Sequence, residues 1–164
     1  MIVSRVLTDK FSENGQEVIR RAFELTSSLN HHMLSVAHIF TALSDVEREL
    51  FVQTMRSVGV NPLSVTQLLE QELAKKPQYL GRQVDFPEQT WDLLNHALRR
   101  SRSRGSKLIE SYDIFVGLFV DPEGLPVEIL RRLGIDPVSG AETITQLIRA
   151  REEQATNPKR SAAP

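Results

Sequence analysis

The residues of this chain that could do chemistry are few and scattered. His31, His32 and His38 lie close together in the sequence and could suggest a metal site. No second ligand stands at a clear metal-binding spacing and no carboxylate cluster accompanies them, so a packed or hydrogen-bonded side chain is the favoured interpretation of His38. We expect His31 and His32 to form a solvated turn. The sequence therefore predicts no metal and no cofactor.

A second feature is a basic run over residues 99–107, whose members are Arg99, Arg100, Arg102, Arg104 and Lys107. Such a patch could bind phosphate groups or an acidic partner protein. Cations also stabilise the last turn of a helix, and this simpler interpretation is favoured for a helix that ends at Gly105. The run holds more cations than a helix dipole needs, so Arg102 and Arg104 stay candidate binding residues.

The sequence contains no constellation typical of an enzyme. The acidic residues form no pair suited to acid–base catalysis, and no serine has a base at a supporting spacing. Cysteine is absent, which excludes thiol catalysis and disulfides. The phosphate-binding motif GxxxxGK[ST] is also absent, because Gly105-Ser106-Lys107 lacks its spacing. We therefore expect a non-catalytic chain.

Composition indicates a globular protein with no whole-chain attraction to nucleic acid. Of 164 residues, 40% are hydrophobic and 25% are charged, and the net charge is −1. The first residues lack the long apolar core of a signal peptide, and no apolar run reaches membrane-spanning length. These features predict a cytoplasmic protein that does not enter membranes.

The elements that must position these residues are organised around a segment that occurs twice. Residues 34–43 and 109–118 share an Ile-Phe pair that follows a polar turn and precedes a leucine by three residues. In each copy the three apolar residues fall on one helical face. We interpret both segments as buried central helices of a small bundle, with Ser35 and Ser111 as their caps.

The repetition extends well beyond the central helices. At a constant offset of 75 residues, Gly59 matches Gly134 and Pro62 matches Pro137, and no gap is needed between residues 11 and 62. The sequence predicts an all-α fold, in which two tandem four-helix repeats related by a pseudo-two-fold axis form one compact eight-helix domain. The expected parts are a lead-in (1–10), repeat 1 (11–75), a connector (76–85), repeat 2 (86–152) and a flexible tail or linker (153–164).

This pattern resembles the Clp N-terminal repeat domain, which receives adaptors and substrates at the front of ClpA- and ClpC-type AAA+ unfoldases. The resemblance covers roughly residues 9–152. It is carried by Phe11-Ser12-Glu13, Ala37-His38-Ile39 and the span from Leu50 to Pro62, with their partners 75 residues later. It implies a protein-binding domain whose partners are Clp adaptor proteins, unfolded or tagged clients, and a Clp ATPase or peptidase.

Two positions depart from the family pattern. Relatives commonly carry Thr-Glu-His-Ile at the start of each central helix, and in some of them the glutamate grips the guanidinium of phosphoarginine. This chain has Ala37 and Tyr112 at those places. Neither side chain can form a carboxylate–guanidinium pair, and Pro87 replaces Ser12 in the second copy. We expect phosphoarginine binding to be lost or much weakened, which calorimetric titration can test.

The resemblance also implies a groove at the seam between the two halves. Phe11 and Phe86 each precede an equivalent helix and could flank this groove, although a hydrophobic staple against their own helices is at least as good an interpretation. With Ser12, Ala37 and Tyr112 they are the candidate peptide-binding residues, and Tyr112 could offer an aromatic contact to an unfolded segment.

Three functions remain open on the sequence. The leading one is reception of adaptors or protein clients for a Clp-type unfoldase, by weak peptide capture in the seam. The alternative is a stand-alone regulatory decoy that competes for Clp adaptors or ligands. Nucleic-acid binding through residues 99–107 is disfavoured by the −1 net charge and the lack of a groove-reading helix signature.

Overall fold

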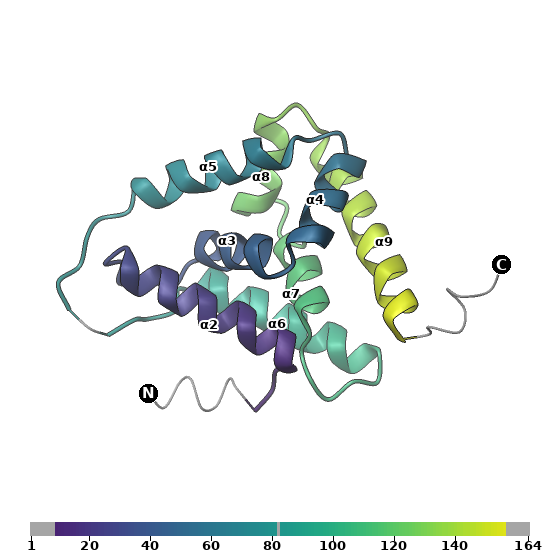
Figure 1. Ribbon diagram of the computed structural model, residues 1–164, viewed down its shortest axis with the longest axis horizontal. Helices are drawn as coiled ribbons and strands as arrows, with labels where there is room; N and C mark the ends of the chain where they lie inside the picture. The colour runs from purple at the N-terminus through teal and green to yellow at the C-terminus, as the bar shows by residue number, and fades with distance from the viewer. Residues whose placement is uncertain (1–8, 82, 157–164) are drawn as a thin grey trace.

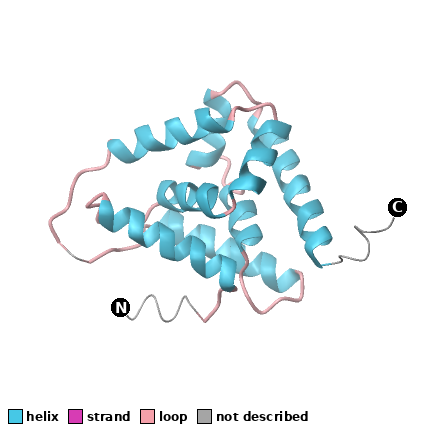
Figure 2. Cartoon of the chain, viewed as in Figure 1, coloured by secondary structure: helices cyan, strands magenta, loops and turns pink. Residues whose placement is uncertain are grey.

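The computed structural model describes residues 9–81 and 83–156, and in this part of the chain every regular element is an α-helix (Figure 1 and Figure 2). The helices are α2 (Glu13–Ser28), α3 (Val36–Val46), α4 (Arg48–Ser57), α5 (Pro62–Ala74), α6 (Glu88–Ser103), α7 (Ser111–Leu118), α8 (Leu125–Arg132) and α9 (Pro137–Thr156). The expectation of an all-α fold is confirmed.

Local side chains set several helix starts. Ser12 precedes α2, and its Oγ accepts the backbone N–H of Gly15 at 3.3 Å. Asn61 caps α5 in the same manner, because its Oδ1 accepts the N–H of Leu63 at 3.0 Å. Pro62 follows as the first helical residue, where its missing N–H costs nothing.

Two expected starts are displaced by one residue. Pro87 is the N-cap of α6 rather than its first residue. Ser111 begins α7 and does not cap it, because Glu110 holds the cap position. The carboxylate of Asp113 accepts the N–H of Glu110 at 2.8 Å, and the Glu110 side chain accepts the N–H of Asp113. This reciprocal pair of acidic residues takes the place that sequence reasoning gave to serine.

A pair of equivalent backbone hydrogen bonds joins the two repeats. The N–H of Ile109 donates to the carbonyl of Lys10 at 2.7 Å, and the N–H of Leu34 donates to the carbonyl of Asp85 at 2.8 Å. Each bond connects the segment before the first helix of one repeat to the segment before the central helix of the other. The exchange is reciprocal, as expected for two repeats related by a pseudo-two-fold axis.

The repeats also share the turns after their third helices. Gly59 follows α4 with φ +87°, and Gly134 follows α8 with φ +82°. A side chain is strained in this left-handed conformation, which explains why glycine recurs at the same offset.

The two central helices form the core, as the repeated segment predicts. Helix α3 lies in the middle of the molecule (Figure 1) and contacts α2, α4, α5, α6, α7 and α8. Ile39 and Ile114, which are equivalent in the two repeats, are both completely buried. Phe40 packs edge-on against Phe51 and Phe119, with ring centroids 6.0 and 5.7 Å apart. A bundle around two such apolar helices needs no metal or disulfide to bury a core.

The segments at the ends of the repeats differ in part from the expected boundaries. A long loop connects α5 to α6 along one side of the molecule (Figure 1). Helix α9 continues to Thr156, so residues 153–156 are helical rather than part of a tail. Residues 1–8 and 157–164, which include most of the expected lead-in and tail, lie outside the described residues. No helix in the described ranges has the length and apolarity needed to span a membrane.

Candidate functional site

Phe11 and Ser12 lie at the junction of the repeats. Phe11 is 2% exposed and forms a backbone bridge with Ile109. The Oγ of Ser12 donates to the carbonyl of Ile109 at 3.2 Å. A Cβ on Gly15 would stand only 2.5 Å from the same carbonyl, which shows how closely α2 approaches this segment. Both candidate residues therefore take part in joining the two halves.

Phe86 is half-buried in a row of aromatic side chains that links α2 to α6. Its ring centroid lies 5.5 Å from that of Phe23 and 5.0 Å from that of Trp91. Phe86 precedes the N-cap of α6 and Trp91 is the fourth residue of the helix, which is the geometry of a hydrophobic staple. Trp91 is 41% exposed, so the outer end of this row reaches the surface.

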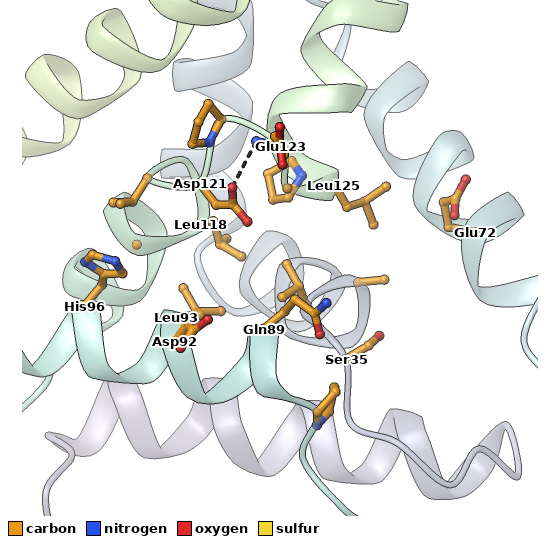
Figure 3. A pocket seen from close by; sticks show the side chains of 18 of the residues that line it. Ser35, Glu72, Gln89, Asp92, Leu93, His96, Leu118, Asp121, Glu123 and Leu125 are labelled. Carbon is orange, nitrogen blue, oxygen red and sulfur yellow. Dashed lines mark hydrogen bonds between the residues drawn. The ribbon is translucent and has the colours of Figure 1, made fainter.

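Ala37 borders a cavity at the seam, which we call the Ala37 groove. The groove has a volume of about 940 Å³ and opens between the start of α3, the end of α5, the first turns of α6 and the α7–α8 turn (Figure 3). Pro87 and Gln89 line it from α6, and Leu118 and Leu125 line it from either side of the turn. Residues from both repeats thus share one cavity large enough for several side chains of a partner.

Tyr112 occupies the position in the second repeat that Ala37 occupies in the first. It is half-buried and packs against the core. Burial raises the pKa of its hydroxyl, and the carboxylates of Glu47 and Glu110 add to this effect. Next to it, the Oγ of Ser111 donates to Glu47 at 2.7 Å. A large ring and a hydrogen bond between repeats stand where the first half leaves the room beside an alanine.

The basic run divides between two environments. Arg100 and Arg104 converge on Asp113, which is completely buried, with nitrogen–oxygen distances of 2.7 and 2.5 Å. Arg100 also pairs with Glu152 of α9 at 2.7 Å. We call these four residues the buried charge network. Each charge in it has an opposite partner, which is the condition for burying ionised groups.

The first repeat holds a different set of side chains at the equivalent positions. Leu25, Leu29 and His38 precede Arg100, Arg104 and Asp113 by 75 residues, and Leu73 precedes Glu152 by the shifted offset of 79. The same part of the fold is therefore stabilised by apolar burial in one half and by ion pairs in the other. The engaged guanidinium of Arg104 makes it a structural residue in this conformation.

Arg102 and Lys107 point to solvent. Both are exposed, and neither forms an ion pair within the described ranges. Arg99 lines the Ala37 groove. The nine-residue run is therefore not a single continuous patch, because its members belong to the surface, the buried charge network and the groove.

His38 is buried and hydrogen-bonded, as the favoured interpretation predicts. Its Nδ1 accepts the backbone N–H of Ser35 at 3.0 Å, so Nε2 carries the proton and donates to Nδ1 of His31 at 2.8 Å. Burial lowers the pKa of His38 to about 3, and His31 and Lys76 contribute. The expectation that His31 lies in a solvated turn is wrong, because it is only 7% exposed. Among the described residues no group of three metal-ligating side chains gathers.

Sequence reasoning missed the charged wall of the groove. Asp92 lies on α6, and Asp121 and Glu123 lie on the α7–α8 turn, on opposite sides of the cavity (Figure 3). The turn itself is apparent from Asp121-Pro122-Glu123-Gly124. The sequence contains no signal that it faces α6, because that contact depends on how the second repeat folds back on the first.

Two tandem four-helix repeats joined across a two-fold seam define the fold as that of a Clp-type N-terminal domain. Residues 10–87 match the model of the Clp repeat (R) N-terminal domain and belong to that family. Among solved structures, the Hsp104 N-terminal domain from Candida albicans superposes with a TM-score of 0.72 at 16% identity, covering 85% of this chain and 89% of that one. A structure titled as a complex of the ClpV N-domain with a VipB peptide has a TM-score of 0.64 at 15% identity, covering 88% and 91%.

The curated relatives are much longer proteins. The chloroplastic ClpA homologue of Brassica napus, an ATP-binding subunit of the ATP-dependent Clp protease, is 21% identical over 155 residues, which are 94% of this chain and 18% of that protein. The chloroplastic chaperone protein ClpC2 of Oryza sativa subsp. japonica is 24% identical over 147 residues, which are 90% and 16%. The chain thus spans less than a fifth of the length of these relatives.

Proposed function

We propose that this domain is a non-catalytic receiver of protein segments, which binds adaptors or protein clients for a Clp-type unfoldase. The observation that carries the proposal is the Ala37 groove, which both repeats line and which has an apolar floor and a polar rim. Grooves of this kind bind partner side chains by removing apolar surface from water, while the rim sets orientation. The titled ClpV complex supports it by analogy, since that N-domain binds a peptide.

The two expectations that concern phosphoarginine and the compartment stay predictions. Ala37 places no carboxylate in the groove, and Tyr112 supplies a phenol at the equivalent position, so an unmodified segment is the better candidate ligand. Cytoplasmic location likewise remains an expectation from the sequence.

Blocking the groove tests the proposal. Gln89 is exposed and lines the groove, so Gln89→Trp should obstruct it without disturbing the core. Gln146 is exposed on α9 and does not line the groove, which makes Gln146→Trp the matched control. The measurement is fluorescence anisotropy with labelled casein, a permanently unfolded protein, as the probe.

The wild-type domain should bind casein, and Gln89→Trp should weaken binding about tenfold, which corresponds to about 1.4 kcal/mol. Gln146→Trp should stay within about twofold of the wild type. Absence of casein binding, or equal binding by the two tryptophan variants, would show that this groove does not receive unfolded segments.

A further inference from the structure

Three carboxylates face the Ala37 groove without a cationic partner among the described residues. Asp92 projects from α6, while Asp121 and Glu123 stand on the α7–α8 turn across the cavity (Figure 3). The Oδ1 of Asp121 accepts the backbone N–H of Glu123 at 2.9 Å, which holds the turn and both of its carboxylates in place. Negative charge is therefore presented to the groove from two separate elements.

The other charged residues of the groove do not neutralise these three. Glu72 is the fourth carboxylate on the lining, and it is already paired with Lys75 at 3.1 Å and with Arg132 at 3.2 Å. Lys76 and Arg99 are the two permanent cations on the lining, and neither forms an ion pair in the described part of the chain. Four carboxylates thus face two such cations, which leaves the cavity locally negative.

The floor between these charges is apolar. Leu93 and Leu118 are 4% and 2% exposed, and Leu125 adds to the floor from the start of α8. Val120 lies on the turn and is 44% exposed, so apolar surface continues to the rim beside Asp121. An occupant that buries an apolar side chain here brings its neighbouring residues next to the unpaired carboxylates.

Given the proposed function, we infer that the Ala37 groove selects protein segments in which an arginine or lysine stands beside a leucine-like residue. The apolar side chain covers Leu93 and Leu118, and the cation pairs with Asp92 and the turn carboxylates. A guanidinium suits this arrangement because its planar fork can bridge acceptors on two elements at once. Each new ion pair forms in a cavity from which the leucine-like side chain has displaced water, and this strengthens it relative to a surface pair.

Matched peptides separate this selectivity from binding itself. The probes are three labelled octapeptides that alternate leucine with arginine, with serine or with glutamate. Wild-type domain should bind the arginine peptide about tenfold more tightly than the serine peptide, and the glutamate peptide least tightly. The double variant Asp92→Asn/Glu123→Gln keeps the shape of the groove and removes two charges, so its preference for arginine over serine should fall to about twofold.

The control removes two charges elsewhere. Glu70 and Glu142 are exposed and do not line the groove, so Glu70→Gln/Glu142→Gln should keep the tenfold preference. Equal binding of the arginine and serine peptides to wild type would overturn the inference and leave the proposed function standing. Binding of none of the peptides would contradict both. Loss of the preference in the control variant would overturn the inference too, because it would assign the effect to overall charge.

Discussion

His38 and Asp113 hold the same place in the two repeats, and each accepts the backbone N–H of the residue that precedes its central helix. His38 accepts it from Ser35 at 3.0 Å, and Asp113 accepts it from Glu110 at 2.8 Å. The backbone of the two repeats is thus held in the same way by two different side chains. Their other partners differ in charge, because His38 meets a second imidazole and Asp113 meets two guanidinium groups.

We predict that Asp113→Ala destabilises the domain by about 3 kcal/mol or more. The substitution leaves Arg100 and Arg104 facing each other with only Glu152 to compensate them, and it removes the acceptor for the N–H of Glu110. Urea unfolding monitored by circular dichroism measures the change.

The control replaces the whole buried charge network by the residues of the first repeat. The variant carries Arg100→Leu, Arg104→Leu, Glu152→Leu and Asp113→His, and it should recover most of the stability lost in Asp113→Ala. An unfolding free energy for Asp113→Ala within about 0.5 kcal/mol of wild type would show that the network contributes little.

Arg102 and Arg104 should respond oppositely to charge reversal. Arg104→Glu places a third carboxylate beside Asp113 and Glu152, so we expect a loss of about 3 kcal/mol or more. Arg102 is exposed, and Arg102→Glu should change stability by no more than about 0.5 kcal/mol. Parallel urea titrations compare the two variants, and similar losses would contradict the assignment of Arg104 alone to the network.

Much of the fold can be predicted from the sequence because its signals are local and occur twice. The offset that relates Ile39 to Ile114 predicts two equivalent buried helices, and Gly59 with Gly134 marks equivalent turns. The displaced start of α7 shows where local rules fall short. Ser111 is a good cap by residue type, but Asp113 is fixed by two distant arginines and so favours Glu110 as the cap.

The candidate site is harder to predict, because it depends on contacts between the repeats. The spacing of Arg100 and Arg104 is equally compatible with a surface patch, and only the arrival of Glu152 on α9 shows that they are buried. His31 looks like a turn residue until His38 is placed 2.8 Å from it. The walls of the Ala37 groove likewise come from segments far apart in the chain.

The buried pair of histidines predicts that acid weakens the fold. In the unfolded chain His38 has the usual pKa near 6.5, and in the folded chain burial and the neighbouring His31 and Lys76 lower its pKa to about 3. Its contribution to stability is therefore complete above about pH 6.5 and is lost progressively as the pH falls toward 3, because only the unfolded chain binds the proton. The slope from this one group approaches about 1.4 kcal/mol per pH unit.

The variant His38→Asn tests this slope. Asparagine keeps an acceptor for the N–H of Ser35 but does not titrate, so its stability should decline less steeply than wild type between about pH 6.5 and about pH 4.5. His96 lies outside the buried pair, and His96→Asn should decline as steeply as wild type. Thermal melts across this range provide the comparison, and identical slopes for wild type and His38→Asn would refute the prediction.

The most direct measurement of the central claim is a map of where an unfolded segment binds. Two-dimensional amide NMR spectra of the domain, recorded while unlabelled casein is added, report on each backbone position. If the Ala37 groove receives the segment, signals that shift or broaden should cluster at Ala37, Gln89, Leu118 and Gly124, all of which line it. Changes confined to the region of Arg102, or no changes at all, would contradict the account.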